Sequence, residues 1–529
     1  MATARGASGR RWVRRRRMSA GLAIVCLATA CSSTVAGRAT VGSPLATSSS
    51  AIPSATDVPS TTSSAAPTTA AAREPDGAVG TIGDDGIGDP YYPLSGNGGY
   101  QVDAYDVDAR YDPVSNDFSA TTTITGTVLS TEGLSRFNLD LSGAMDVSAV
   151  TVNGAPAADV EHDEDELVIT PADLAAAGSA LTVTVTYAGN PTVVDGGTGG
   201  LGDGGWYHLD GGGALAVGEP FSASAWYPVN EHPSDPATFA VTMTVPEGWQ
   251  VISNGRQQTD GLPAAPAGST VFRWAIDKPI ASYLTTVYVD KFTVLTDQLA
   301  DGTPIVSALG PTAVGDRAAA ESTREVIAAL EEWFGPYPYD SAGGIFPGQD
   351  LGFALETASR PVYFAGTSIG IVAHEQAHQW YGDLVSIDRW ADICLNECFA
   401  SYAEWLWDAR TNGVDLDARW KVAMADTVRE ARFWRSPLVD MGAGEEFTRV
   451  YDRGPLAVHA LRAEMGDEAF FALLKGWPAT HGGQVVDWTE FENYTSSIAG
   501  RDMKPFLDAW FRSTTVPDEP YRTPGSLGG

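Results

Sequence analysis

The chain has 529 residues, of which 43% are hydrophobic, and its formal net charge is −33. This length is enough for two or three domains with sizeable cores. The large excess of acidic side chains argues against nucleic acid or an anionic membrane surface as a main partner.

Residues 1–30 have the pattern of a secretion signal, with arginines between residues 10 and 17 and an apolar stretch after them. The apolar stretch is too short to span a membrane as a helix. The segment from Leu27 to Ser33 resembles a bacterial lipoprotein cleavage site. We therefore expect export, with Cys31 as a lipidated amino terminus that attaches the protein to the outer face of the cytoplasmic membrane. Secretion without a lipid is the alternative.

Residues 31–92 are rich in Ser, Thr, Ala, Pro and Gly. Such a composition cannot bury enough apolar surface to offset the conformational entropy that is lost on ordering the chain. We predict a disordered stalk over this range.

Residues 93–298 show apolar and polar side chains in alternation, as half-buried strands do. The segments 137–141 and 181–187 are examples, and Asn-Gly pairs at 153–154 and 254–255 are typical of tight turns between strands. We predict an all-β sandwich or saddle for this domain.

From residue 299 the pattern becomes helical, and we assign residues 299–515 to a second domain with both helices and strands. A long helix is predicted over residues 313–333, and strands of a small mixed sheet over residues 340–365. Further helices follow. The residues 516–529 are rich in Pro and Gly, which predicts a flexible tail.

A metal-binding pattern, His-Glu-Gln-Ala-His, begins at His374 in this second domain. Residues four apart lie on one face of a helix, so His374 and His378 can direct two imidazoles to one ion. Glu375 follows the first of these ligands, where its carboxylate can reach a water on the ion and act as the general base. Ser368, or Thr367 before it, can cap the start of this helix.

A second predicted helix, residues 392–410, carries the remaining ligand. Glu397 completes a set of two imidazoles and one carboxylate, and a fourth position stays open for water and substrate, as in catalytic zinc sites. The ligand types and the ordinary availability of metals favour one zinc ion per chain. Glu404 lies two helical turns beyond Glu397 on the same face. It can accept a hydrogen bond from a ligand imidazole, or it can form a surface ion pair.

Cys394 and Cys398 flank Glu397 at a spacing of one helical turn. A disulfide within one helix is expected to be strained. We therefore expect two buried free thiols, with a thiolate contribution to the zinc site as the alternative. The chain has four cysteines and no pattern of a disulfide framework.

These motifs resemble the aminopeptidase-N and leukotriene-hydrolase branch of the gluzincin metallopeptidases. The likeness is strongest over residues 374–383 and 390–404. Residues 352–357 are similar to the family's Gly-x-Met-Glu-Asn segment, and residues 451–454 to its Tyr-x-Lys-Gly segment. Stretches of residues 219–255 are similar to its amino-terminal β domain, and all of these segments occur in the family's order.

The resemblance implies an amino-terminal β domain followed by a thermolysin-like α+β catalytic domain, without the large helical carboxy-terminal domain of longer members. It implies that Tyr451 stabilises the oxyanion and that Glu356 binds the free amino group of the substrate. Glu219 is a further candidate for that ammonium group. A packing role stays open for Tyr451, as does a structural or surface role for the two glutamates.

The leading hypothesis is a zinc-dependent aminopeptidase that releases amino-terminal residues from peptide substrates. An endopeptidase or dipeptide-releasing enzyme of the same fold is an alternative, because a missing helical domain would leave the cleft more open. A non-catalytic surface binding protein on this scaffold is another. Glu375 argues against it, because a binding module has no use for a general base. The sequence indicates no protein partner.

Overall fold

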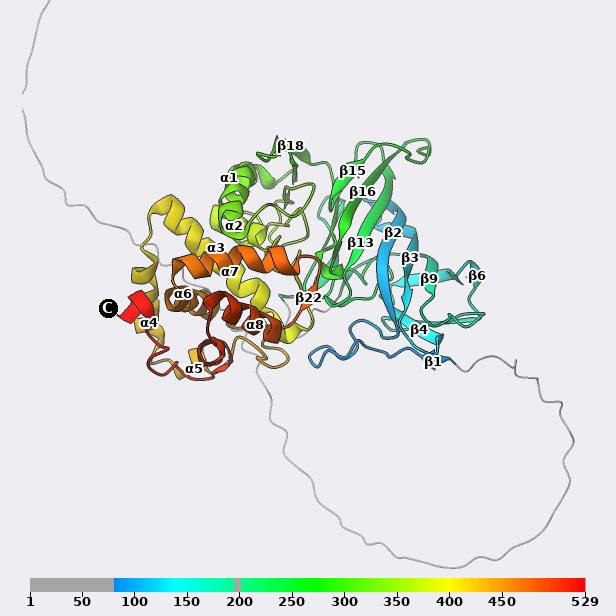
Figure 1. The fold of residues 1–529 in the computed structure, drawn as a ribbon. Coiled ribbons are helices and arrows are strands. Elements are labelled where there is room, and N and C mark those ends of the chain that lie inside the picture. The colour runs from blue at the N-terminus through cyan, green and yellow to red at the C-terminus, as the bar shows by residue number, and fades with distance from the viewer. Residues whose placement is uncertain (1–79, 195–200, 529) are drawn as a thin grey trace, which may run out of the picture. The chain divides into compact units, whose positions relative to one another are not determined.

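The computed structural model describes residues 80–194 and 201–528 of the chain. The predicted secretion signal, Cys31 and the predicted stalk up to residue 79 lie outside the described residues. All described residues fall within one structural unit, which contains several β-sheets and a group of helices (Figure 1).

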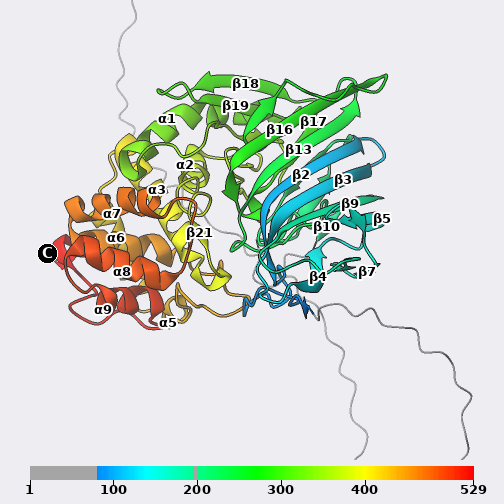
Figure 2. The ribbon, with the colours of Figure 1, turned by 45° about the vertical axis from the view of Figure 1, so that its right-hand side comes forward.

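An eight-stranded sheet dominates the amino-terminal region and confirms the predicted all-β character. In its strand β2, Tyr105, Val107 and Ala109 are buried while the residues between them face solvent. One face of the sheet is therefore packed, as the alternation predicted. Figure 2 shows β16, β13, β2, β3 and β9 side by side. In sheet order the strands are β15 (Arg256–Gln258), β16 (Ser269–Ile280), β13 (Ala237–Pro246), β2 (Tyr100–Asp112), β3 (Asp117–Val128), β9 (Ala180–Gly189), β5 (Met145–Val152) and β6 (Ala155–Pro156).

A tight turn joins β5 to β6 in this large sheet. Asn153 and Gly154 have φ values of 50° and 82° there, the left-handed backbone that an Asn-Gly hairpin turn requires.

Two smaller sheets complete the β region. One sheet has the order β1 (Thr81–Ile82), β4 (Leu134–Asp140), β8 (Glu166–Thr170) and β7 (Asp159–Asp163). The other has the order β10 (Val193–Val194), β11 (Gly204–His208), β12 (Ala214–Val217), β17 (Val287–Asp290) and β14 (Gln250–Ser253).

The boundary between the two regions differs from the predicted position at residue 298. β18 (Thr293–Gln298) pairs with β19 (Pro304–Leu309), and β19 pairs in parallel with β20 (Ile345–Phe346). β18 therefore belongs to a small sheet of the second region, where it also contacts α1. Its side chains are mostly exposed, so its sequence carries no pattern that assigns it to one sheet or the other.

The sheet predicted over residues 340–365 is smaller than expected. This range is fully described and contains β20 as its one strand, while Leu355 and Val362 pair as an isolated bridge. Glu356 therefore lies in an irregular segment and not on a strand. The side-chain amide of Gln379 donates a hydrogen bond to the Glu356 carbonyl at 3.0 Å and so holds this segment in place.

Helices make up most of the second region. α2 (Ile369–Ala377) packs against both α1 (Arg317–Phe334) and α3 (Cys394–Asn412). α3 ends at Gly413, whose φ of 65° gives the left-handed C-cap that glycine favours. None of the described helices combines the length and the apolar composition that a membrane span requires. The remaining α-helices are α4 (Leu416–Thr427), α5 (Ala431–Trp434), α6 (Arg453–Met465), α7 (Asp467–His481), α8 (Trp488–Ala499) and α9 (Lys504–Leu507), and β21 (Ser386–Ile387) pairs with β22 (Val485–Val486).

Both ends of the described chain are more ordered than predicted. Residues 80–92, which were assigned to the disordered stalk, include β1, which pairs with β4. In the predicted flexible tail, Leu527 is 3% exposed, and the Tyr521 carbonyl accepts a hydrogen bond from the Trp510 indole at 2.8 Å. Composition underestimated the order of both segments, because main-chain pairing and a few anchored side chains do not require a high apolar content.

Candidate metal centre and substrate site

Helix α2 presents the first two metal-binding residues. The Ser368 hydroxyl oxygen accepts a hydrogen bond from the main-chain N–H of Ile371 at 3.3 Å and caps the helix, as predicted. His374 lies in the last turn of α2, and His378 is the residue directly after the helix. Their ring centres are 4.9 Å apart, so the one-turn spacing places both imidazoles on one side of the helix end.

The carboxylate of Glu397, in the first turn of α3, reaches both imidazoles. Its Oε2 atom is 3.1 Å from Nε2 of His374 and 3.6 Å from Nε2 of His378, and all three side chains are buried. Donor atoms at about 2.1 Å from a tetrahedral zinc ion are separated from one another by about 3.4 Å. The spacing of these three side chains therefore fits a zinc ion.

The outer nitrogen of each imidazole is held by an acceptor. Nδ1 of His374 lies 2.9 Å from Oε1 of Glu404, and Nδ1 of His378 lies 3.0 Å from the Tyr381 carbonyl oxygen. A neutral ring that donates from Nδ1 has its lone pair on Nε2. Both lone pairs then point at the Glu397 carboxylate. This arrangement of acceptors is stable only if a cation is bound between them or if the rings carry extra protons. The Tyr381 carbonyl is a main-chain group that no side-chain pattern could reveal.

Burial and neighbouring charges set the proton affinities of the acidic groups at this centre. Burial by itself raises the pKa of Glu397, but the imidazoles of His378 and His374 lower that pKa to about 2. Burial raises the pKa of Glu375 to about 8, against the opposing effect of the same imidazoles. A bound divalent cation lowers the pKa of a nearby carboxyl group. Glu375 can therefore both accept and release a proton near neutral pH.

Two further buried carboxylates adjoin this centre. Glu356 accepts a hydrogen bond from the Tyr283 hydroxyl at 3.1 Å, and its carboxylate lies within 4.8 Å of ligand atoms of Glu375 and His378. Glu219 is 1% exposed, and neither of its carboxylate oxygens has a hydrogen-bond partner among the described residues. Burial and, next, the charge of Glu356 raise the pKa of Glu219. Buried carboxylates with so few partners call for a cationic group from outside the chain.

Tyr451 lies beside the imidazoles. Its ring centre is 6.0 Å from that of His374, and the residue is 41% exposed. Burial and, next, the charge of Glu397 raise the pKa of its hydroxyl, although the exposed part of the ring limits the effect of burial. The hydroxyl therefore keeps its proton and can donate a hydrogen bond to a substrate oxygen.

Cys394 and Cys398 form a disulfide, contrary to the expectation of two free thiols. Their Cα atoms are 4.8 Å apart, within the range that a disulfide spans, so one helical turn does not prevent the bond. Both residues are fully buried. A thiolate ligand to zinc is excluded in this disulfide form.

Sequence reasoning missed two residues that hold the substrate site in place. Gln379 directly follows His378, so its position in the chain pointed to the site, although its contact with the Glu356 carbonyl did not follow from any pattern. Tyr283 lies far earlier in the chain, and only the tertiary structure brings its hydroxyl to Glu356.

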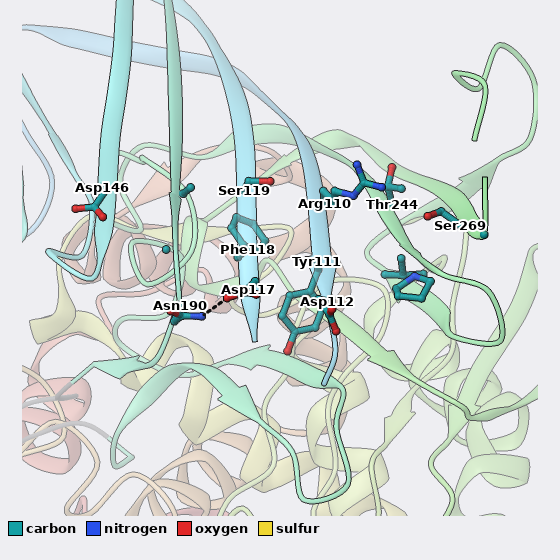
Figure 3. A pocket seen from close by; sticks show the side chains of 15 residues that line it. Arg110, Tyr111, Asp112, Asp117, Phe118, Ser119, Asp146, Asn190, Thr244 and Ser269 are labelled. Atoms are coloured by element: carbon teal, nitrogen blue, oxygen red, sulfur yellow. Dashed lines mark hydrogen bonds between the residues drawn. The ribbon is translucent and has the colours of Figure 1, made fainter. Parts of the chain in front are cut away.

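A hollow of about 600 Å³ in the β region is lined by none of these residues (Figure 3). It is bordered by strands β2, β3 and β13, and Asn190 donates a hydrogen bond to Asp117 at 3.2 Å on its wall. No imidazole or thiol lines this hollow, so it offers no ligand set comparable with that of the metal centre.

Two family models match the chain. Residues 101–284 match the Peptidase M1 N-terminal domain, and residues 358–510, which include the three metal-binding residues, match the Peptidase family M1 domain. A solved M1 zinc metallopeptidase from Deinococcus radiodurans is 30% identical to the chain, which covers 99% of that protein. The chain belongs to the M1 family of zinc metallopeptidases. The predicted resemblance to the aminopeptidase-N-like metallopeptidases and the predicted zinc cofactor are thereby confirmed.

The M1 relatives of this chain differ in length. The Deinococcus radiodurans structure superimposes with a TM-score of 0.72 over 82% of this chain, and a mutant of that enzyme bound to a Tyr-Ser-Ala substrate does so with a TM-score of 0.72 over 83%. Aminopeptidase N of Streptomyces lividans is 24% identical over 322 residues, which are 54% of this chain and 36% of that protein. For aminopeptidase N of Lactococcus lactis the identity is 28% over 158 residues, which are 28% of this chain and 19% of that protein. The chain thus spans about a third or less of the length of these two curated relatives.

Proposed function

We propose that this M1 peptidase is a zinc-dependent aminopeptidase that removes residues from the amino terminus of peptides. The observation that carries the proposal is the pair of buried carboxylates, Glu356 and Glu219, beside the metal centre. The α-ammonium group of a peptide offers the positive charge and the hydrogen-bond donors that both carboxylates need. A clamp held at this distance from the metal would select the bond that follows the first residue.

The side chains around the metal can perform the hydrolysis. Zinc, when bound by the two imidazoles and Glu397, would polarise the scissile carbonyl and lower the pKa of a water molecule. Glu375 takes a proton from this water as its oxygen bonds to the carbonyl carbon, and it delivers the proton to the leaving amine when the C–N bond breaks. The Tyr451 hydroxyl donates a hydrogen bond to the developing oxyanion. Glu404 keeps one imidazole in the tautomer that can bind the metal.

The test compares unblocked and amino-blocked aminoacyl amides with the zinc-loaded protein. We expect hydrolysis of the unblocked substrates only. The Glu375→Gln variant should bind zinc like the unchanged protein but lose roughly a hundredfold to ten-thousandfold in kcat, because the general base is missing. Glu468→Gln, at an exposed glutamate in the first turn of α7, is the matched control and should keep full activity.

Two outcomes would contradict the proposal. Equally fast cleavage of blocked substrates would remove the role of Glu356 as an ammonium clamp and favour an endopeptidase. Zinc binding without turnover of any peptide would favour a non-catalytic binding protein.

We further propose that the enzyme is exported and attached to the membrane through a lipid on Cys31. The proposal is supported by the basic and apolar pattern of residues 1–30 and by the lipoprotein-like segment around Cys31. The mass of the mature amino-terminal peptide tests it. An unmodified amino terminus at any other residue would be inconsistent with lipidation.

A further inference from the structure

Glu446 is a buried carboxylate that forms no ion pair with any described residue. It is 0% exposed, and apart from the Tyr92 hydroxyl beside it no described residue offers its oxygens a hydrogen bond. Arg449, the nearest arginine along the chain, pairs with Asp452 instead, at 2.7 Å. A buried carboxylate without a cationic partner destabilises the folded protein, so such a group is expected where a ligand supplies the missing donors.

The segment that carries Glu446 runs beside the metal centre. The next residue, Phe447, stacks on Tyr451 with ring centres 6.5 Å apart and an angle of 14° between the planes. Tyr451 in turn lies 6.0 Å from the ring of His374. Glu446 is therefore one residue away from a side chain that packs on the proposed oxyanion donor.

Tyr92 links Glu446 to the carboxylates of the ammonium clamp. Its hydroxyl lies next to the Glu446 carboxylate and has no other hydrogen-bond partner among the described residues. Burial and, next, the charges of Glu446 and Glu219 raise the pKa of this hydroxyl, so both carboxylates act on it. The Tyr92 ring meets the edge of Trp390, with 6.1 Å between ring centres. Trp390 lies 5.5 Å from the ring of Tyr283, the residue whose hydroxyl donates to the Glu356 carboxylate.

The rings of Tyr283, Trp390 and Tyr92 thus form a continuous aromatic wall from Glu356 to Glu446. Along it the indole N–H of Trp390 also lacks a partner among the described residues. So many buried polar atoms without hydrogen bonds in one place are typical of a site that a polar ligand completes.

The charges of this site exceed what one ammonium group can neutralise. Glu219 and Glu356 share the α-ammonium of the substrate in the proposed function, which leaves Glu446 in need of a second cation. The part of a peptide nearest to its α-ammonium is the first side chain. The long apolar stem of lysine or arginine can lie along aromatic rings while its charged end reaches a carboxylate.

We propose that Glu446 selects substrates whose first residue has a positively charged side chain, arginine or lysine. This inference rests on the aminopeptidase function proposed above and names its substrate class. Glu446 is then a specificity-determining residue, and it takes no part in bond cleavage.

The experiment compares the kcat/KM values of arginyl, citrullyl and leucyl amides with the full-length, zinc-loaded protein. Citrulline has nearly the length and shape of arginine but carries no charge, so the ratio of the arginyl to the citrullyl value isolates the charge. We expect a ratio of at least about tenfold in the unchanged protein, because a buried charge-assisted hydrogen bond is lost with citrulline. In Glu446→Gln the ratio should fall to within about twofold. Glu445→Gln alters the exposed neighbouring residue and should keep the original ratio.

Equal hydrolysis of arginyl and citrullyl amides by the unchanged protein would overturn the inference, and so would an undiminished ratio in Glu446→Gln. If Glu446→Gln fails to bind zinc or lacks the circular dichroism spectrum of the unchanged protein, the inference is tested on the unchanged protein alone. Free arginine should then inhibit leucyl amide hydrolysis at least about tenfold more strongly than free citrulline, and equal inhibition would refute the selection. A failure of the proposed function looks different, because no unblocked amide, leucyl amide included, would be hydrolysed.

Discussion

Two different supports hold the ligand imidazoles at the residue scale. His374 is held by the side chain of Glu404, and His378 by the main-chain carbonyl of Tyr381. Such supports fix the tautomer and the ring orientation and raise the basicity of the ligand. Only the side-chain support can be removed by substitution, so Glu404 allows its contribution to be measured separately.

Replacing Glu404 by Gln should weaken zinc binding by roughly tenfold to a hundredfold. The reason is that an amide oxygen accepts a hydrogen bond from Nδ1 of His374 less strongly than a carboxylate does. Competition for zinc with a chelator of known affinity measures the change. Glu332→Gln is the control, because Glu332 also pairs with a residue of α3, Arg410, but on the protein surface. Equal zinc affinities in Glu404→Gln and Glu332→Gln would mean that Glu404 forms only a surface ion pair.

Helix α3 combines a metal ligand, the support of another ligand and a disulfide within three turns. Cys394 and Cys398 lie before and after Glu397, and the helix packs against α6. The approach is closest at Gly454, where a Cβ atom would lie 2.7 Å from the sulfur of Cys398. The disulfide thus lies in the packed interface of two helices, away from solvent.

Both cysteines should resist alkylation in the native protein and also in denaturant without reductant. They should each take up one alkyl group only after denaturation together with a reductant, because the sulfurs are bonded to each other and fully buried. Mass spectrometry of the peptide that contains Cys394 and Cys398 separates them from Cys26 and Cys31. Alkylation of this peptide in denaturant alone would show two free thiols, as the sequence predicted.

At the scale of the whole molecule, Asp89 joins segments that are far apart in the chain. Its carboxylate accepts a hydrogen bond from the main-chain N–H of Trp390 at 2.9 Å and pairs with Nε2 of His232 at 3.2 Å. Burial raises the pKa of Asp89, but the hydrogen bonds from His232 and Trp390 outweigh it, and the pKa is lowered overall. A carboxyl group with a lowered pKa stabilises the folded state above its unfolded-state pKa. The contribution is lost as the pH falls through the folded-state pKa.

Replacing Asp89 by Asn should therefore lower the thermal midpoint at pH 7 by several degrees, equivalent to about 1–3 kcal/mol. The difference from the unchanged protein should shrink as the pH is lowered below about 4, because the native carboxyl group is then protonated as well. Thermal scans of both proteins at neutral pH and at the acidic pH measure this difference in thermal midpoint. Asp173→Asn, at an exposed position, is the control. A difference that stays constant with pH would mean that the charge of Asp89 contributes nothing.

The sequence by itself determined the features that depend on local spacing. His374, Glu375 and His378 come from one helical turn, and Glu397 and Glu404 from one face of the next helix, so periodicity placed them without knowledge of the fold. The strands of the β region followed from alternation for the same reason. Ser368 followed from the chemistry of helix capping.

Only the tertiary structure decided which distant groups meet. Glu219 and Glu356 come from different regions of the chain, yet burial and, next, the charge of Glu356 raise the pKa of Glu219. Tyr92 and Glu446 are also far apart in the sequence, and the fold places the Tyr92 hydroxyl beside the Glu446 carboxylate. Composition predicted disorder where β1 pairs through its main chain, because composition does not encode hydrogen-bond partners. Contacts between residues far apart in sequence arise from packing, and no local periodicity records them.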